Sequence, residues 1–183
     1  MHTFFNMEIY FVRHTSVAVA PGTCYGHTDV PLSSSFNEEA SETKSHLDGI
    51  DFDAVYSSPL SRAMKLAAFC GYSNPITDSR LIELNFGDWE MCRYDDLYKE
   101  SPEFRDWCSH YISYRCPHGE SLEDQTARVR SFVESLLQQP YRRVCVFCHG
   151  GVLAIARSLD GSISLEKSLE SIPPYGSVIK IEL

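Results

Sequence analysis

The chain has 183 residues, enough to bury one substantial hydrophobic core and too few to invite division into two ordinary domains. Hydrophobic residues make up 43% and charged residues 22% of the sequence, which excludes disordered and collagen-like compositions. With 16 basic and 25 acidic residues the net charge is −9, so an anionic substrate would have to bind in a local basic pocket.

The sequence carries no signal for export or membrane insertion. No apolar run approaches the ~20 residues that span a bilayer, and residues 1–15 lack the features of a signal peptide. Seven cysteines, an odd number, fit reduced thiols better than a disulfide framework. We therefore expect a single domain over residues 1–183 of a cytoplasmic protein, with a small-molecule partner rather than nucleic acid or a membrane. A homodimer is compatible with the sequence, and Met7 is an alternative start to Met1.

The first part of the chain alternates strand and helix patterns. Residues 8–12 are mainly β-branched and aromatic, which predicts a short buried strand. Apolar residues recur at helical spacing over residues 36–47, and Ser35 with Glu38 has the pattern of a capping box for that helix. Residues 53–57 predict a second strand.

The middle of the chain predicts one regular helix followed by a less regular segment. Ser58 and Pro59 suit the N-cap and first turn of a helix whose apolar spacing continues to Cys70. Residues 97–116 are rich in aromatic side chains without a clean period. We expect a helical excursion at about residues 88–120 that caps a functional site.

The last third of the chain shows the clearest periodicity. Residues 121–138 are apolar on one helical face and charged on the other, and residues 143–148 form a near-continuous apolar strand. A helix is expected at 152–159, and the alternation over 177–183 predicts an edge strand. The fold class is therefore α/β, a three-layer α/β/α sandwich with a mainly parallel sheet and one antiparallel edge strand.

Cationic groups follow three of the expected elements. Arg13 and His14 end the first strand. Arg62 lies in the first turn of the helix that follows the second strand, and His149 follows the apolar strand at residues 143–148. Ligands of such sheets bind beyond the carboxyl ends of the strands, where helix N-termini add backbone N–H donors. This edge of the sheet therefore suits a phosphate or another small anion.

Four motifs, in chain order, carry a resemblance to a known family. They are Arg13-His14-Thr15, the stretch Ser57–Arg62, Glu83 with Phe86–Glu90, and Cys148–Gly151. Together they resemble the signatures of the histidine phosphatase superfamily, which also contains the phosphoglycerate mutases and has the phosphoglycerate mutase-like fold. The segment 22–32 is most similar to the α-ribazole phosphatases of cobalamin assembly, whose substrate is α-ribazole 5′-phosphate or the phosphorylated cobalamin made from it.

The resemblance implies a phosphomonoester hydrolase that works through a phosphohistidine intermediate. Neutral His14 would attack phosphorus, and water would then hydrolyse the intermediate. Arg13, Arg62 and a cationic His149 would hold the phosphoryl oxygens, so that neither a metal nor a cofactor is needed. Glu83 would protonate the leaving alkoxide and later deprotonate water.

Further contacts and one departure also follow from the comparison with the family. Tyr25, Gly26 and Gly150 occupy loop positions that imply contact with substrate. Ala20 stands where mutases and many phosphatases have Asn, so one donor on the phosphate side is missing or replaced. Residues 93–116 match nothing in the family pattern, which leaves the contacts to the leaving group open.

Two other features allow more than one interpretation. Cys145, Cys148 and His149 match the pattern of c-type haem attachment, but side chains three apart on a strand point to opposite faces, which excludes haem and zinc roles for the pair. The aromatic residues of the excursion either form a wall for a planar leaving group or pack within the cap. They are Trp107, Tyr111 and Tyr114.

Two rival functions remain open from the sequence. One is a broad-specificity phosphatase or a phosphoglycerate mutase-type enzyme of the same fold, although the longer insertions that mutases use are absent. The other is a non-catalytic module that binds phosphorylated ligands. The combined presence of His14, Glu83 and His149 argues against the second rival.

Overall fold

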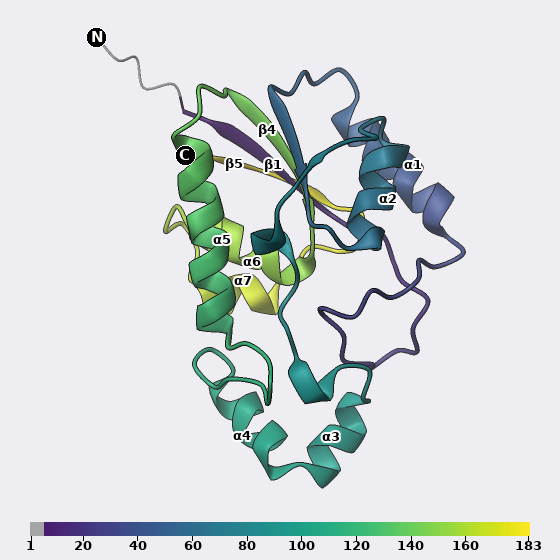
Figure 1. Ribbon diagram of the computed structural model, residues 1–183, viewed down its shortest axis with the longest axis vertical. Coiled ribbons are helices and arrows are strands. Elements are labelled where there is room, and N and C mark those ends of the chain that lie inside the picture. Colours follow the sequence, from purple (N-terminus) through teal and green to yellow (C-terminus); the bar gives the residue numbers. More distant parts are fainter. Residues whose placement is uncertain (1–5) are drawn as a thin grey trace.

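A five-stranded sheet forms the centre of the molecule in the computed structural model, which describes residues 6–183. The strand order is β3-β2-β4-β1-β5, and β5 runs antiparallel to β1 while the other pairs are parallel (Figure 1). The strands are β1 (Glu8–Arg13), β2 (Ala54–Ser57), β3 (Ile76–Thr77), β4 (Arg143–Cys148) and β5 (Val178–Glu182). The predicted parallel sheet with an antiparallel edge strand is confirmed, whereas residues 1–5, including the start at Met1, lie outside the described residues.

Helices cover both faces of this sheet and extend beyond it. Among the described residues they are α1 (Phe36–Leu47), α2 (Ser61–Phe69), α3 (Tyr94–Glu100), α4 (Pro102–His110), α5 (Leu122–Leu137), α6 (Gly150–Ser158) and α7 (Leu165–Glu170), with 3-10 turns at Ser79–Leu81 and Gly87–Trp89. Figure 1 shows α3 and α4 set apart from the sheet, beyond the N-terminal end of α5. No helix in residues 6–183 is long and apolar enough to span a membrane.

Strand β4 lies at the middle of the hydrophobic core. Its residues from Val144 to Cys148 are fully buried, because helices pack on both of its faces. Cys145 packs with α1 and α2 on one face, and Cys148 packs with α5 and α6 on the other. The two thiols therefore point to opposite faces, as the strand period predicted.

The predicted capping interactions of two helices are wrong, for local reasons. Helix α2 begins at Ser61 rather than at Pro59, because the chain stays extended through Leu60 and Ser58 hydrogen-bonds to His149 instead of capping the helix. Ser35 does precede α1, but its hydroxyl bonds to Glu39, so the predicted capping box with Glu38 does not form.

The structure adds elements that the sequence pattern did not predict. Strand β3 has only two residues, both exposed, and α7 has six, so neither shows a usable period. Helix α6 begins at Gly150, two residues earlier than expected and directly after His149. The aromatic-rich segment forms two short helices, α3 and α4, because Ser101 and Pro102 end one and begin the next.

Candidate active site

His14 lies directly beyond the end of β1, with its imidazole orientation fixed by the backbone. Its Nδ1 lies 2.7 Å from the carbonyl oxygen of Thr15, which can only accept a hydrogen bond. Nδ1 therefore carries the proton, and Nε2 keeps the lone pair that a nucleophile requires. Burial, then the charges of Arg62 and Arg13, lower the pKa of His14 to about 3, so the ring is neutral at physiological pH.

His149 lies beside His14 because the sheet register brings the two strand ends together. Arg13 pairs with Cys148 across β1 and β4, so the residues that follow them are neighbours. The two imidazole centroids are 5.2 Å apart. Two segments separated by more than 130 positions in the sequence are thus joined at one edge of the sheet.

The ring of His149 is neutral in this arrangement. Its Nδ1 lies 3.3 Å from Nε of Arg62, a permanent donor, so Nδ1 accepts and Nε2 donates to the Ser58 hydroxyl at 2.7 Å. Burial, followed by the charge of Arg62, lowers the pKa of His149 well below its ordinary value. The cationic His149 expected beside a bound phosphate stays a prediction, because a phosphate anion would favour that form.

Two buried neutral histidines make the stability of the protein depend on pH. The unfolded chain takes up a proton on His14 as the pH falls below about 6.5, whereas the folded pKa is about 3. Between these values the unfolded state binds more protons, so stability falls with pH, and the contribution of His14 is about 2 kcal/mol at pH 5. The free energy of unfolding, measured with urea, should decrease from pH 7.5 to pH 5.0 by a correspondingly smaller amount in His14→Asn than in the wild-type protein. The same pH dependence in both proteins would contradict this, and His46→Asn, at an exposed position, is the control.

Arg62 lies against His149 and is completely buried. Besides its contact with His149, its Nη1 donates to the carbonyl of Thr28 at 2.8 Å and its Nη2 to that of Gly26 at 2.5 Å. Three of its five N–H groups are thereby engaged, which fixes the plane of the guanidinium. The other two N–H groups, one on each Nη, make no hydrogen bond among the described residues, and Nη1 lies 4.0 Å from Oδ1 of Asp29.

A half-buried carboxylate, Glu90, shapes the loop that holds Arg62. It accepts hydrogen bonds from the amides of residues 26, 27 and 28, from the Thr28 hydroxyl and from the amide of Phe86. Burial alone would raise the pKa of Glu90, but the bonds from Thr28 and the other amides outweigh it and lower the pKa. Gly26 is required in this loop, since a Cβ there would lie 1.8 Å from the carbonyl oxygen of Leu84.

Arg13 and two tyrosines lie on the other side of His14. The Arg13 guanidinium sits 4.1 Å from the ring centroid of Tyr175 and donates to the carbonyl of Pro173 at 2.6 Å. The Tyr175 hydroxyl is 2.8 Å from that of Tyr25, and the ring centroid of Tyr175 lies 5.5 Å from that of His14. Nε of Arg13 is buried without a hydrogen-bond partner among the described residues.

Glu83 is held by N–H groups from three different segments. Its Oε1 accepts from the amide of Leu84 at 3.0 Å and from Gln125 at 2.8 Å, and its Oε2 accepts from the amide of Gly151 at 3.0 Å. A Cβ at position 151 would lie 2.4 Å from Oε1, so any other residue there would displace the carboxyl group from this position. The carboxyl group is therefore fixed close to the N-terminus of α6.

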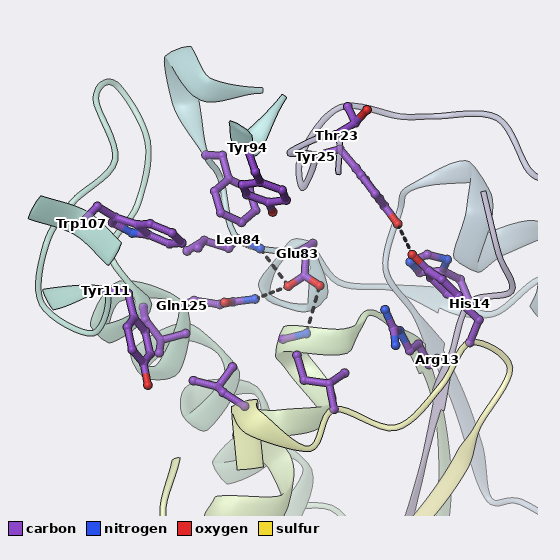
Figure 2. Close-up of a pocket in the computed structure, with 16 residues that line it drawn as sticks. Arg13, His14, Thr23, Tyr25, Glu83, Leu84, Tyr94, Trp107, Tyr111 and Gln125 are labelled. Atoms are coloured by element: carbon purple, nitrogen blue, oxygen red, sulfur yellow. Dashed lines mark hydrogen bonds between the residues drawn. The ribbon is translucent and has the colours of Figure 1, made fainter. Parts of the chain in front are cut away.

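These groups border a cavity of about 410 Å³ whose other walls are mainly apolar. Its polar end contains Arg13, His14 and Glu83, and Figure 2 shows Trp107 and Tyr111 at the opposite end. Its lining residues include the apolar and aromatic side chains of Tyr25, Leu84, Phe86, Tyr94, Trp107, Tyr111, Leu122, Leu169, Ile172 and Tyr175. The cavity thus joins a cationic and nucleophilic end to an aromatic end.

Not every predicted site residue lines the cavity. Arg62, His149 and Gly26 are not among its lining residues, and Gly150 packs against the Arg13 guanidinium, where a Cβ would be 3.2 Å from Nε. Both backbone polar groups of Gly26 are engaged, one by Glu90 and one by Arg62. Ala20 is exposed and its carbonyl closes a turn with Thr23, so it is not part of the cavity wall.

The aromatic residues of the excursion divide between the cavity wall and the interior of the excursion. Trp107 and Tyr111 line the cavity, whereas Tyr114 is not among its lining residues and packs in the cluster around Trp89 and Phe104. Trp107 also packs on Phe104, with ring centroids 5.4 Å apart. One aromatic cluster therefore supports the cavity wall and fills the interior of the excursion.

The comparison with known proteins identifies the family. Residues 9–183 match the histidine phosphatase superfamily (branch 1). The chain belongs to this superfamily. An adenosylcobalamin/alpha-ribazole phosphatase of Escherichia coli (strain K12) is 32% identical over 155 residues, which cover 81% of this chain and 76% of that protein. Membership of the superfamily, with such relatives, makes the protein a phosphatase-type enzyme that acts on small phosphorylated compounds.

Solved structures show the same fold in other histidine phosphatases. The alpha-ribazole phosphatase from Shigella flexneri has a TM-score of 0.87 at 26% identity, covering 96% of this chain and 90% of that chain. The phosphoglycerate mutase from Thermus thermophilus has a TM-score of 0.76 at 28% identity, covering 96% and 92%. The predicted phosphoglycerate mutase-like fold is confirmed.

Sequence reasoning missed four side chains that contact the predicted site residues of this histidine phosphatase. Ser58 and Glu90 belong to motifs that were recognised, but their partners are distant in sequence, so their contacts could not be predicted. Gln125 could have been noticed as a polar residue on an apolar helix face. Tyr175 lies in a short Pro- and Gly-rich loop with no periodic signal.

Proposed function

We propose that the enzyme removes the 5′-phosphate from α-ribazole 5′-phosphate, or from the phosphorylated cobalamin made from it, in the cytoplasm. The observation that carries this proposal is the pairing of a neutral, oriented His14 with a cavity that is cationic at one end and aromatic at the other. A benzimidazole base is planar and apolar, which suits the Trp107 and Tyr111 end. The names of the E. coli and Shigella flexneri relatives support the same substrate.

In the proposed reaction, Nε2 of His14 attacks phosphorus in line with the leaving oxygen. The P–N bond forms as the P–O bond to the sugar breaks, and the phosphoryl charge is offset by Arg13 and Arg62. The unpartnered Nε of Arg13 and the two unused N–H groups of Arg62 are the donors available for this purpose. His149 stabilises the arrangement through Arg62 and Ser58.

Glu83 completes the proposed reaction as a proton carrier. It protonates the leaving alkoxide in the first step and takes a proton from the attacking water in the second. Its fixed position at the cavity wall, between the aromatic side chains and the pair Arg13 and His14 in Figure 2, supports this role. The helices α3 and α4 would then cap the site, since Tyr94 and Trp107 reach the cavity from them.

Initial rates on three substrates test this proposal. Without added metal and with a chelator present, we expect kcat/KM for α-ribazole 5′-phosphate to exceed that for 3-phosphoglycerate and p-nitrophenyl phosphate by at least about tenfold. Similar values for all three would favour a broad-specificity phosphatase. Preference for 3-phosphoglycerate with transfer rather than release of phosphate would indicate a mutase, and no turnover at all would favour a binding module.

A further inference from the structure

Gln125 is a polar residue on an otherwise apolar face of α5. The buried residues of this helix follow the helical period and are Leu122, Gln125, Val129, Phe132, Val133 and Leu136. Gln125 is 0% exposed. A buried amide destabilises a core unless it is hydrogen-bonded, so an apolar side chain would be the expected occupant of this position.

The side-chain amide of Gln125 makes its hydrogen bond with Glu83. Its Nε2 donates to Oε1 of Glu83 at 2.8 Å, while its own Oε1 has no partner among the described residues. The side chain also packs against Gly151, where a Cβ would lie 3.1 Å from Nε2. The polar contact that the structure gives this buried amide is therefore with the carboxyl group of Glu83.

The two carboxylate oxygens of Glu83 accept different numbers of hydrogen bonds. Oε1 accepts two hydrogen bonds, from Leu84 and Gln125, which fill both of its lone pairs. Oε2 accepts one, from Gly151, and keeps a second lone pair. Figure 2 draws Oε1 on the Gln125 side of the carboxyl group and Oε2 on the His14 side. A proton on Glu83 is thus accommodated on Oε2 and not on Oε1.

We propose that Gln125 is a positioning residue that directs the transferred proton to Oε2 of Glu83, an inference that rests on the proposed role of Glu83 as acid and base. In the first step the Oε2–H bond breaks, the leaving oxygen gains that proton, and the P–N bond to His14 forms as the P–O bond breaks. In the second step a proton of the attacking water returns to Oε2, the water oxygen bonds to phosphorus as the P–N bond to His14 breaks, and phosphate is released. Gln125 donates to Oε1 throughout both steps.

The dependence of the rate on the leaving group tests this role, because a poor leaving group needs the proton and a good one does not. Gln125→Met retains the size of the side chain and removes the donor. We expect kcat/KM, which reports the steps through phosphorylation of His14, to fall on the order of 10- to 100-fold for ribose 5-phosphate and less than about threefold for p-nitrophenyl phosphate. Gln139→Met, at an exposed position, should leave both values unchanged.

Comparison with variants of Glu83 separates this inference from the proposed function. Glu83→Gln should also lower kcat/KM mainly for the substrate with the poor leaving group, and by a larger factor than Gln125→Met. Adding Gln125→Met to Glu83→Gln should lower kcat/KM no further. An equal loss on both substrates in folded Gln125→Met, or in Gln125→Leu if the first variant does not fold, would overturn the positioning role. If Glu83→Gln leaves kcat/KM for ribose 5-phosphate unchanged, the acid role of Glu83 itself is wrong, whatever the effect of Gln125→Met.

Discussion

Replacing His14 by Asn should lower kcat/KM for phosphomonoesters by at least about 10⁴-fold, because the covalent route to phosphate release is lost. The wild-type ring offers Nε2 as the nucleophile, since Nδ1 is committed to the carbonyl of Thr15. An amide has no comparable lone pair. Initial rates of phosphate release measure the loss, and brief incubation with ³²P-labelled substrate followed by denaturation in alkali should trap label on the wild-type protein alone.

His46→Asn is the matched control, because His46 lies on the exposed surface of α1. This variant should retain wild-type rates and trapping. Turnover by His14→Asn at more than a few per cent of the wild-type rate would refute the phosphohistidine mechanism. Trapped label that is equally present on His14→Asn would assign the covalent step to another residue.

The second large effect is expected at Glu90, whose carboxylate accepts five hydrogen bonds from the loop around Thr28 and from Phe86. In Glu90→Gln one oxygen becomes an NH₂ group and faces N–H donors. We expect the free energy of unfolding to fall by about 3 kcal/mol, equivalent to a decrease in Tm of about 10 °C. Because the loop carbonyls orient Arg62, kcat/KM should also fall on the order of 100-fold.

Thermal unfolding and initial rates on the same preparation test both parts of this prediction. Glu100→Gln, an exposed residue of α3, should change neither quantity. A loss of stability with unchanged kcat/KM would show that the loop is not needed to orient Arg62. Unchanged stability would show that the N–H groups find other acceptors, which would contradict the importance assigned to the carboxylate.

The motifs predicted the site because they coincide with strong local patterns. The runs Glu8–Arg13 and Arg143–Cys148 are apolar enough to form buried strands, and parallel strands necessarily present their carboxyl ends at one edge. His14 and His149 could therefore be expected to meet. Their roles, with those of Arg13, Arg62 and Glu83, remain predictions that the variants above test.

The ionisation of His149 could not be predicted in the same way. A histidine near a phosphate site suggests a cation, but burial and the Nε of Arg62 make the neutral form the stable one here. The start of α2 was mispredicted for a related reason. Ser58 is a good N-cap by composition, yet its hydroxyl is taken by His149, which lies 91 positions later in the chain.

By itself the sequence determined the α/β class, the family and the residues placed at the strand ends, because these depend on local periodicity and on short motifs. Only the tertiary structure decided which groups face the cavity, that Glu90 fixes the loop under Arg62, and that Gln125 contacts Glu83. Each of these depends on a hydrogen bond between residues that are distant in sequence. Such contacts are selected by the packing of the whole chain, which no local pattern encodes.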